Sequence, residues 1–469
     1  MAKKQSALQA KKLREARSTL REVLKELKPT AREIKEATVY ANQLMGRLKK
    51  ASPEYVEIIL AGSVARGTQV RGSHDIDIFL LFPKEMGEEE MENKGLEIGK
   101  SIVKNHRNES YVIKYAEHPY VKLLLDDINM TADIVPAFKI SSAEEMGSAV
   151  DRTQLHNLFV NSKLSKKQRD DVRLLKGFLN YHGVYGASAR VEGFSGYLCE
   201  LLVYHYGSFI GVIKNFSEIK VPLAIDPLGG AKGQPEIEEL AKRFGSEMVV
   251  VDPTDRNRNV AANVSGESLA KFSISCRAFL RDPSKKVFFG PGHSDINARG
   301  SISRLRKELG VDIYVVCLGV KEVAEDILWQ QLKKLRKTLE WALERNGFLP
   351  ILSVQNIQGG KAIISFFMEK AENRSTKAKG PSAFMPEAAD SFISAHMKSY
   401  LLYVEGERIF SIERPRYRTQ KEFLRAAVLQ NNINFPSYIK RAGAAIYVNS
   451  MPERYAKMLH SALADKTLL

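Results

Sequence analysis

Two aspartates in an otherwise apolar stretch are the residues of this chain best suited to chemistry. Asp75 and Asp77 are the only charged residues of segment 75–82, whose sequence is Asp-Ile-Asp-Ile-Phe-Leu-Leu-Phe. An apolar run bounded by turn signals predicts a buried strand, in which alternate side chains point to the same face. The two carboxylates should therefore lie side by side, while Ile76 and Ile78 point into a core.

Paired carboxylates at the edge of an apolar sheet repel each other and lose hydration, and a divalent cation such as Mg²⁺ would relieve both costs. The alternative is an exposed edge strand whose aspartates are simply solvated. Upstream, Gly62-Ser63 stands where an apolar run stops. A Gly-Ser turn that opens a helix offers N–H groups and a hydroxyl to phosphate oxygens. A phosphate seat beside metal-binding carboxylates favours nucleotidyl transfer over the solvated edge.

An α/β unit is predicted around these residues, because short apolar strands alternate with helical segments. Two helices are expected within 5–50, separated at Pro29, with Thr30 able to cap the second. The other predicted elements are strand 56–61, a helix from about Ser63, strand 75–82, helix 86–105, strands 110–116, 120–125 and 129–135, and a linker over 136–147.

The rest of the chain mixes helices and strands. The predicted elements are a mostly helical region over 153–215, a helix over 260–281 begun by Asn259, strands 312–318, 361–368 and 400–412, a long helix over about 324–345, and a mobile loop over 371–381. A basic cluster with one aromatic follows at 414–418 and suits RNA, although an exposed loop explains it nearly as well.

The order of the motifs resembles the nucleotidyltransferase superfamily of DNA polymerase β, in which a third carboxylate comes from a separate strand. Asp133, the one acid in the apolar segment 128–137, is the candidate for that carboxylate. More narrowly, the chain resembles the archaeal (class I) CCA-adding enzymes, which are tRNA nucleotidyltransferases. This likeness spans residues 1–280 in the family's order and is looser beyond them. It rests on segments 66–68, 115–120, 150–156, 173–179, 183–187, 193–202 and 258–263.

The resemblance implies an α/β plus α+β multidomain fold: a polymerase-β-like nucleotidyltransferase head with a mixed sheet, a helical neck, and an α/β body and tail. The N-terminal helices and head are expected at 1–150, the neck at 151–282, and the tRNA-binding body and tail at 283–469. The implied reaction is template-independent addition of CCA to the 3′ end of tRNA from CTP and ATP, with release of pyrophosphate.

Two Mg²⁺ ions are implied as cofactors of this reaction. Asp75 and Asp77 would serve the ion on the triphosphate, and Asp133 would complete the ligation of the ion at the attacking 3′-hydroxyl. The implied partner is tRNA, gripped by its acceptor stem, T-arm and 3′ end. The oligomeric state is left open, with a homodimer as one option.

Six further residues resemble the family's nucleotide contacts. Ser63 and Arg66 match triphosphate contacts, and Arg66 can bind phosphate oxygens bidentately. His156, Lys176, Tyr185 and Arg258 match a nucleotide-binding histidine, lysine and tyrosine and the arginine that reads the Watson–Crick edge of the incoming base. Each of these last four residues alone has a plainer explanation: a surface histidine, a solvated helix lysine, a turn aromatic and an arginine that caps a loop.

The whole composition fits a polyanionic partner. The 469 residues carry a net charge of +16, and the sequence has a pI of about 9.4. Lysines and arginines in such excess favour binding to a phosphate backbone, although charge alone does not separate RNA from DNA or an anionic membrane. Three widely spaced cysteines predict a reducing cytoplasm, and neither a signal peptide nor an apolar run long enough to span a bilayer is recognised.

Two other functions compete with CCA addition. A poly(A) polymerase or another RNA terminal nucleotidyltransferase would keep the head but change the substrate, and the neck motifs with Arg258 argue against it. A non-catalytic RNA-binding protein with a relic head is opposed by the intact set of acids. DNA repair synthesis is more remote, because no DNA-binding module of that superfamily is recognised at the N-terminus.

Overall fold

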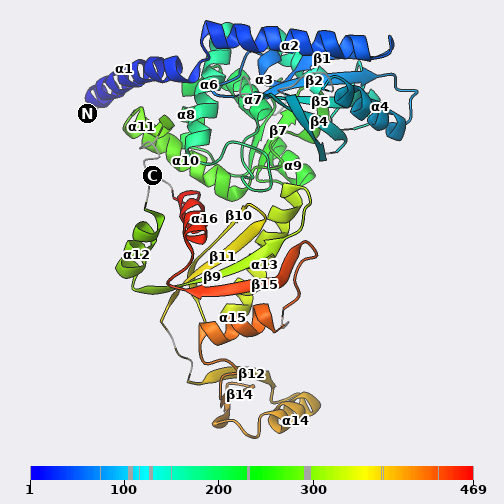
Figure 1. The fold of residues 1–469 in the computed structure, drawn as a ribbon. Coiled ribbons are helices and arrows are strands. Elements are labelled where there is room, and N and C mark those ends of the chain that lie inside the picture. The colour runs from blue at the N-terminus through cyan, green and yellow to red at the C-terminus, as the bar shows by residue number, and fades with distance from the viewer. Residues whose placement is uncertain are drawn as a thin grey trace. The chain divides into compact units, whose positions relative to one another are not determined.

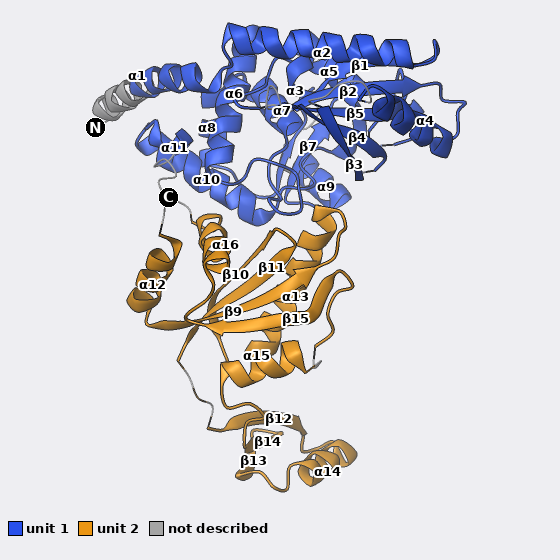
Figure 2. Ribbon diagram, viewed as in Figure 1, with its two compact units in different colours: residues 1–292, 468–469 blue, residues 293–467 orange. Residues whose placement is uncertain are grey.

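The chain forms two compact units, residues 1–292 and residues 293–467 (Figure 2). The computed structural model describes residues 2–73, 75–103, 109–115, 117–125, 130–148, 150–229, 233–289, 297–370, 372, 374–430 and 433–467, without the side chains of residues 2–14 and of Gln234. The predicted head (1–150) and neck (151–282) both lie in unit 1. The three-domain boundaries stay a prediction.

A five-stranded mixed sheet with the order β1-β2-β5-β4-β3 forms the first part of unit 1 (Figure 1). Its strands are β1 Glu57–Ala61, β2 Asp75–Phe82, β3 Glu109–Tyr115, β4 Pro119–Leu125 and β5 Met130–Phe138. The pair β2–β5 is parallel and the other pairs are antiparallel. The predicted strands and the mixed sheet are thus confirmed.

The two faces of this sheet have different neighbours. Helices α2 (Ala31–Ala51) and α4 (Glu88–Ser101) pack on the face that carries the fully buried Ile76 and Ile78. Because alternate residues of a strand face opposite sides, Asp75 and Asp77 belong to the other face. The predicted arrangement of apolar and acidic side chains is confirmed.

Helices build most of the second part of unit 1. They are α5 Thr153–Lys163, α6 Lys166–Tyr181, α7 Gly196–Tyr206, α8 Phe209–Ser217, α9 Gln234–Phe244, α10 Gly266–Arg281 and α11 Lys286–Phe289, with a small sheet of β6 Leu223–Ile225, β7 Met248–Asp252 and β8 Asp255–Asn259. The helix α1 (Ala2–Leu27) docks on α6, where Gly177 leaves room for the Leu27 side chain. Thr30 caps α2 in a capping box, as predicted.

Two expectations for unit 1 are wrong in detail. The strand β5 runs through Pro136, where the sequence predicted the start of a linker. Its pairing with β4 extends only to Ile134, so the edge of β5 that faces β4 does not need the N–H group that proline lacks. The helix predicted from about Ser63 is present as the short α3, Gly62–Ala65. Asn259 ends β8, and α10 begins only after Ser265, whose hydroxyl accepts a bond from the Ser268 N–H. The predicted residues 104–105, 116 and 129 lie outside the described residues.

Unit 2 is built on a four-stranded antiparallel sheet with the order β10-β11-β9-β15. Helices α13 (Glu325–Arg345) and α15 (Gln420–Leu429) pack on one face of this sheet, and α12 (Ala298–Leu309) and α16 (Glu453–Ala464) pack on the other. A three-stranded sheet, β12-β14-β13, carries α14. The bounds are α12 Ala298–Leu309, β9 Val311–Val320, α13 Glu325–Arg345, β10 Pro350–Gln358, β11 Lys361–Glu369, β12 Thr376–Ser382, α14 Pro386–Ala395, β13 Leu401–Glu405, β14 Arg408–Glu413, α15 Gln420–Leu429, β15 Ile439–Val448 and α16 Glu453–Ala464.

The strongest patterns of unit 2 are confirmed and the weaker ones are corrected. The predicted strands 312–318 and 361–368 and the long helix correspond to β9, β11 and α13. The single strand predicted over 400–412 is a hairpin, because Gly406 turns the chain with φ +60°. The predicted loop 371–381 contains β12, while residues 371 and 373 lie outside the described residues. No helix within the described residues is both long enough and apolar enough to cross a membrane.

Candidate active site

The three predicted acids lie on one face of the sheet of unit 1. In the parallel pair β2–β5, Asp77 is directly opposite Asp133, and Asp75 is opposite Thr131. Residues paired in this way point to the same face, so the register brings Asp75, Asp77 and Asp133 together. The Thr131 hydroxyl donates a 2.6 Å hydrogen bond to Asp75 Oδ1. Their predicted role as metal ligands stays a prediction.

The acids are held where negative charge is costly. Burial, followed by the charges of Asp133 and Asp75, raises the pKa of Asp77 to about 6, although the Arg66 guanidinium opposes this shift. Burial also raises the pKa of Asp133. Carboxylates whose protonation is favoured in this way are stabilised in the ionised form by a bound cation. This set of hard oxygen donors therefore fits a divalent ion such as Mg²⁺.

The Gly62-Ser63 turn lies directly against these acids. Gly62 has φ +67°, and a Cβ on it would lie 1.7 Å from Asp77 Oδ2, so only glycine fits there. The half-buried Ser63 follows in α3, beside the end of β1. The predicted phosphate seat and the predicted metal ligands are therefore adjacent. That Ser63 binds phosphate stays a prediction.

Lys122 is a member of this site that the sequence did not predict. It stands opposite Asp133 in the antiparallel pair β4–β5. Its ammonium donates a 2.9 Å bond to Asp133 Oδ1 and lies 3.6 Å from Asp75 Oδ1. In the absence of a metal, this cation therefore offsets part of the carboxylate charge.

We expect Lys122→Met to lower the Mg²⁺ concentration that half-saturates the protein by about fivefold, because an ion pair of this exposure contributes about 1 kcal/mol and competes with a metal ion. Calorimetric titration with Mg²⁺ measures the change. Lys139→Met is the matched control, since the Lys139 ion pair with Glu57 lies on the surface. An unchanged or higher Mg²⁺ requirement in Lys122→Met would contradict this competition.

Another group of possible ligands lies elsewhere. Among the described residues, Glu88, Glu92 and His118 are the one set of three acidic, cysteine or histidine side chains whose ligand atoms all lie within 4.8 Å of one another. The 2.8 Å bond between His118 Nδ1 and Glu92 accounts for their closeness and ties the β3–β4 connection to α4. The ligand atoms of Asp75, Asp77 and Asp133 do not all lie within this distance of one another.

Arg66 and Lys176 meet where the segment after α3 contacts α6 and α7. Arg66 is buried, donating from Nε to Glu200 (3.1 Å) and from Nη1 to Asn157 Oδ1 (3.0 Å). Lys176 Nζ donates to the Thr68 carbonyl oxygen (3.1 Å) and hydroxyl (3.3 Å). Lys176 is buried and is therefore not the solvated helix lysine of the plainer explanation. The bonds of Arg66 use two of the five N–H groups of its guanidinium, so a phosphate contact through the other N–H groups needs neither bond to be exchanged.

His156 and Arg258 share one buried carboxylate. Asp252 Oδ2 lies 3.0 Å from His156 Nε2 and accepts a 2.8 Å bond from Arg258 Nη1. The His156 ring stacks on Tyr197 with centroids 3.7 Å apart, and the Tyr197 hydroxyl donates to Asp252 Oδ1. Burial lowers the pKa of His156, although Asp252 opposes this shift. The structure therefore brings His156 and Arg258 together, more than one hundred residues apart in sequence.

Tyr185 lies beside Lys176 at the start of α7. A Cβ placed on Gly196 would lie 3.3 Å from the Tyr185 hydroxyl and 3.6 Å from Lys176 Nζ. Burial raises the pKa of Tyr185, so its hydroxyl stays protonated and can donate a hydrogen bond. The predicted nucleotide contacts thus form two groups, one of Arg66, Lys176 and Tyr185 and one of His156 and Arg258.

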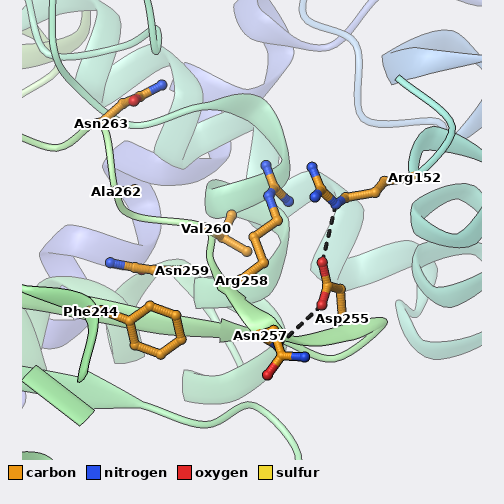
Figure 3. A pocket seen from close by; sticks show the side chains of 9 residues that line it. All are labelled: Arg152, Phe244, Asp255, Asn257, Arg258, Asn259, Val260, Ala262 and Asn263. Atoms are coloured by element: carbon orange, nitrogen blue, oxygen red, sulfur yellow. Dashed lines mark hydrogen bonds and ion pairs between the residues drawn. The ribbon is translucent and has the colours of Figure 1, made fainter. Parts of the chain in front are cut away.

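A cavity of about 480 Å³ borders the second group (Figure 3). Arg152, which is ion-paired with Asp255 at 3.2 Å, and Arg258 contribute guanidinium groups to its lining. The remaining lining residues are Phe244, Asn257, Asn259, Val260, Ala262 and Asn263. Guanidinium and amide groups around an aromatic ring suit a nucleobase, which needs a stacking surface and partners for its polar edge.

Lys122, Glu200 and Asp252 are the site residues that sequence reasoning missed. Lys122 and Glu200 are the lone charged residues of apolar segments, Val-Lys-Leu-Leu-Leu and Tyr-Leu-Cys-Glu-Leu-Leu. Asp252 ends the apolar Val249-Val250-Val251 run. A charge embedded in an apolar run was the signal that identified Asp133, and it could have identified all three.

Comparisons with known proteins agree over nearly the whole chain. Family models described as nucleotidyltransferase domain, tRNA nucleotidyltransferase second domain, and CCA-adding enzyme C-terminal domain match residues 41–156, 170–289 and 310–445. The CCA-adding enzyme of Archaeoglobus fulgidus is 35% identical over 85% of this chain and 86% of its own. That of Methanocaldococcus jannaschii is 33% identical over 92% and 96%. A solved structure of the Cid1 terminal uridylyl transferase matches with a TM-score of 0.47 at 15% identity, over 60% of this chain and 100% of its own.

Proposed function

Because the chain belongs to the family of CCA-adding enzymes, we propose that it adds cytidine, cytidine and adenosine to the 3′ end of tRNA. CTP and ATP are the nucleotide donors, and pyrophosphate is the other product. The 3′-hydroxyl of the RNA attacks the α-phosphorus, so one P–O bond forms as the bond to pyrophosphate breaks. No nucleic-acid template takes part.

The register of β2 against β5 is the observation that carries this proposal. It sets Asp77 beside Asp133 and aligns Asp75 on the same face, while Gly62 fits against the Asp77 carboxylate. The acids therefore hold negative charge next to the turn that would seat the triphosphate. Two Mg²⁺ ions bound here would lower the pKa of the 3′-hydroxyl and neutralise the leaving pyrophosphate.

The two groups of nucleotide contacts divide the substrate between them. Arg66 lies in the segment that follows Ser63, Lys176 donates to Thr68 of that segment, and Tyr185 lies beside Lys176. The three residues bind the triphosphate by charge and hydrogen bonds. Arg258 borders the 480 Å³ cavity, where its guanidinium donates to cytosine O2 and N3 or to adenine N1. His156 contacts Arg258 and shares its carboxylate, so it supports the base-reading side.

The partner is tRNA, and its binding is supported by the net charge of +16. Unit 2 grips the acceptor stem and T-arm by shape and phosphate contacts, the manner in which double-stranded RNA is usually recognised. The protein works in the cytoplasm. The free, buried thiols of Cys199, Cys276 and Cys317 suit that reducing compartment.

The test is end-point extension of a tRNA that lacks its three terminal nucleotides. With Mg²⁺, CTP and ATP, the product should be three nucleotides longer and should then stop growing. Chelation of the metal should abolish extension. Long homopolymer tails from ATP alone would instead support the alternative, a poly(A) polymerase or other RNA terminal nucleotidyltransferase, and absence of extension would contradict both.

A further inference from the structure

Glu200 is a fully buried carboxylate in the middle of α7, remote from the acids of the sheet in sequence. Burial of an ionised carboxylate is costly unless charged or hydrogen-bonding partners compensate. Its neighbours in α7 are apolar, and a leucine at this position would extend that apolar helix at no such cost. The contacts of Glu200 should therefore reveal what the charge does.

Those contacts join α7 to the segment that follows Ser63. Glu200 Oε1 accepts a 2.5 Å bond from the Thr68 hydroxyl and a 3.1 Å bond from Arg66 Nε. The other carboxylate oxygen lies 3.0 Å from Arg66 Nε. Asn157 holds Nη1 of the same guanidinium at 3.0 Å. The orientation of Arg66 is thus fixed from two sides.

The same carboxylate offsets a second buried cation. Lys176 is 2% exposed, and its ammonium donates to Thr68, which itself donates to Glu200. No ion pair of 4.0 Å or less joins Lys176 to an acid within the described residues. One carboxylate therefore faces two buried cations, and this local excess of positive charge suits a phosphate group.

We propose that Glu200 is a positioning residue for the triphosphate of the incoming nucleotide. Through two direct hydrogen bonds it holds Arg66 and Thr68, and through Thr68 it holds Lys176, so that both cations are in place before the nucleotide binds. Glu200 itself does not touch the substrate. The inference rests on the proposed function, because it concerns the same nucleotide site.

Glu200→Gln tests this role, because it keeps the side-chain shape and removes the charge. We expect its affinity for CTP to fall at least about tenfold, the effect of losing a hydrogen bond to a charged group. Its affinity for CMP should stay within about twofold of the unmodified protein, because the base-reading group does not include Glu200. Calorimetric titration measures both values. A general packing defect would weaken CTP and CMP alike, and that result, or unchanged CTP binding, would overturn the proposal.

Ser275→Ala is the matched control. Ser275 is 2% exposed in α10, within the helical part of unit 1, and its hydroxyl has no hydrogen-bond partner among the described residues. Its CTP and CMP affinities should stay unchanged. If the unmodified protein binds CTP but does not extend tRNA, the proposed function fails while the role of Glu200 in triphosphate binding survives.

Two further variants test the positioning role of Glu200 if Glu200→Gln does not fold. Glu200→Asp keeps the charge, and Thr68→Val removes one of the two direct bonds but leaves the Arg66 contact. Both variants should bind CTP more weakly than the unmodified protein, while their affinity for CMP should stay near that of the unmodified protein. Thr68→Val with unchanged CTP affinity, or with CMP affinity reduced equally, would count against the positioning role.

The pH profile of CTP affinity gives an independent readout. Burial lowers the pKa of Lys176, and the charge of Glu200 opposes that shift. The other charged or titratable groups that act on Lys176 are Cys199, Arg66 and Arg173, and the Tyr185 hydroxyl lies close to its ammonium. Without the Glu200 charge, Lys176 should lose its proton at a lower pH. The loss of CTP affinity on the alkaline side should therefore begin at a lower pH in Glu200→Gln, and an unmoved profile would contradict the coupling.

Discussion

Asp77→Asn should lower the rate of CCA addition by about 10³-fold or more, because Asp77 is a proposed metal ligand and its loss would remove several kcal/mol of transition-state stabilisation. The same change should make the metal-free protein more stable. Asp77 is buried beside Asp133 and Asp75, and these surroundings raise its pKa to about 6. A neutral amide of the same shape does not incur that cost. Single-turnover extension and thermal unfolding measure the two effects.

The sign of the stability effect follows from proton linkage. In the folded state Asp77 has a pKa of about 6, whereas in the unfolded chain it has its ordinary value of about 4. The stability of the unmodified protein therefore falls as the pH rises from about 4 to about 6. At neutral pH this destabilisation is at most about 3 kcal/mol. Asp77→Asn should lack this contribution, and Mg²⁺ should stabilise it less than the unmodified protein.

Glu57→Gln is the control for Asp77→Asn. Glu57 belongs to β1 of the same sheet, but it is exposed and pairs with Lys139 at the surface. Its rate and its stability should stay near those of the unmodified protein. An Asp77→Asn protein that extends tRNA at the normal rate would refute the catalytic assignment of the acids.

Asp252→Ala should lower the free energy of unfolding by about 2–4 kcal/mol, because it leaves the buried polar groups of His156 and Tyr197 without their partner, at about 1–3 kcal/mol each. The Asp252 carboxylate accepts bonds from His156, Tyr197, Thr254 and Arg258. Base selection should suffer with stability, since Arg258 loses the group that orients it. Denaturant unfolding of the full chain, followed by circular dichroism, measures the stability loss.

The pH dependence supplies a second test of Asp252. Its hydrogen bonds with His156, Thr254 and Arg258 hold the pKa of the Asp252 carboxyl well below its ordinary value, despite burial. A carboxyl of this kind contributes stability above about pH 4, and that stability is lost as pH falls further. Asp252→Ala should therefore show a weaker loss of stability in acid. Asp282→Asn, at an exposed position after α10, is the control; an Asp252→Ala protein as stable as this control would contradict the ion-pair account.

The sheet of unit 1 could be predicted from sequence because its signals are local. Apolar runs bounded by turns located β2 and β5, and single acids inside those runs identified Asp77 and Asp133. Strands with weaker signals were missed: β12 is the polar Thr-Lys-Ala-Lys-Gly-Pro-Ser, and β15 contains Gly443 between two alanines. In such strands the pairing partners supply the stability that intrinsic propensity does not.

The missed site residues depend on contacts between distant segments. Glu200 and Thr68 are 132 positions apart, and Asp252 and His156 are 96 positions apart. A single acid in an apolar helix, such as Glu200, can be recognised from the local sequence. Its partners Arg66 and Thr68 become known only from the packing of α7 against the segment after α3. The same holds for Lys122, whose position beside Asp133 requires the register of β4 and β5.

Stepwise addition tests the central claim most directly, with each nucleotide supplied alone to tRNA ending one, two or three residues short. If this sheet and its neck form a CCA-adding site, CTP alone should add two cytidines to the shortest tRNA and one to the next, and then stop. ATP alone should add a single adenosine only to tRNA that already ends in the two cytidines. Addition of adenosine to every substrate, long tails, or no addition under any condition would contradict the account.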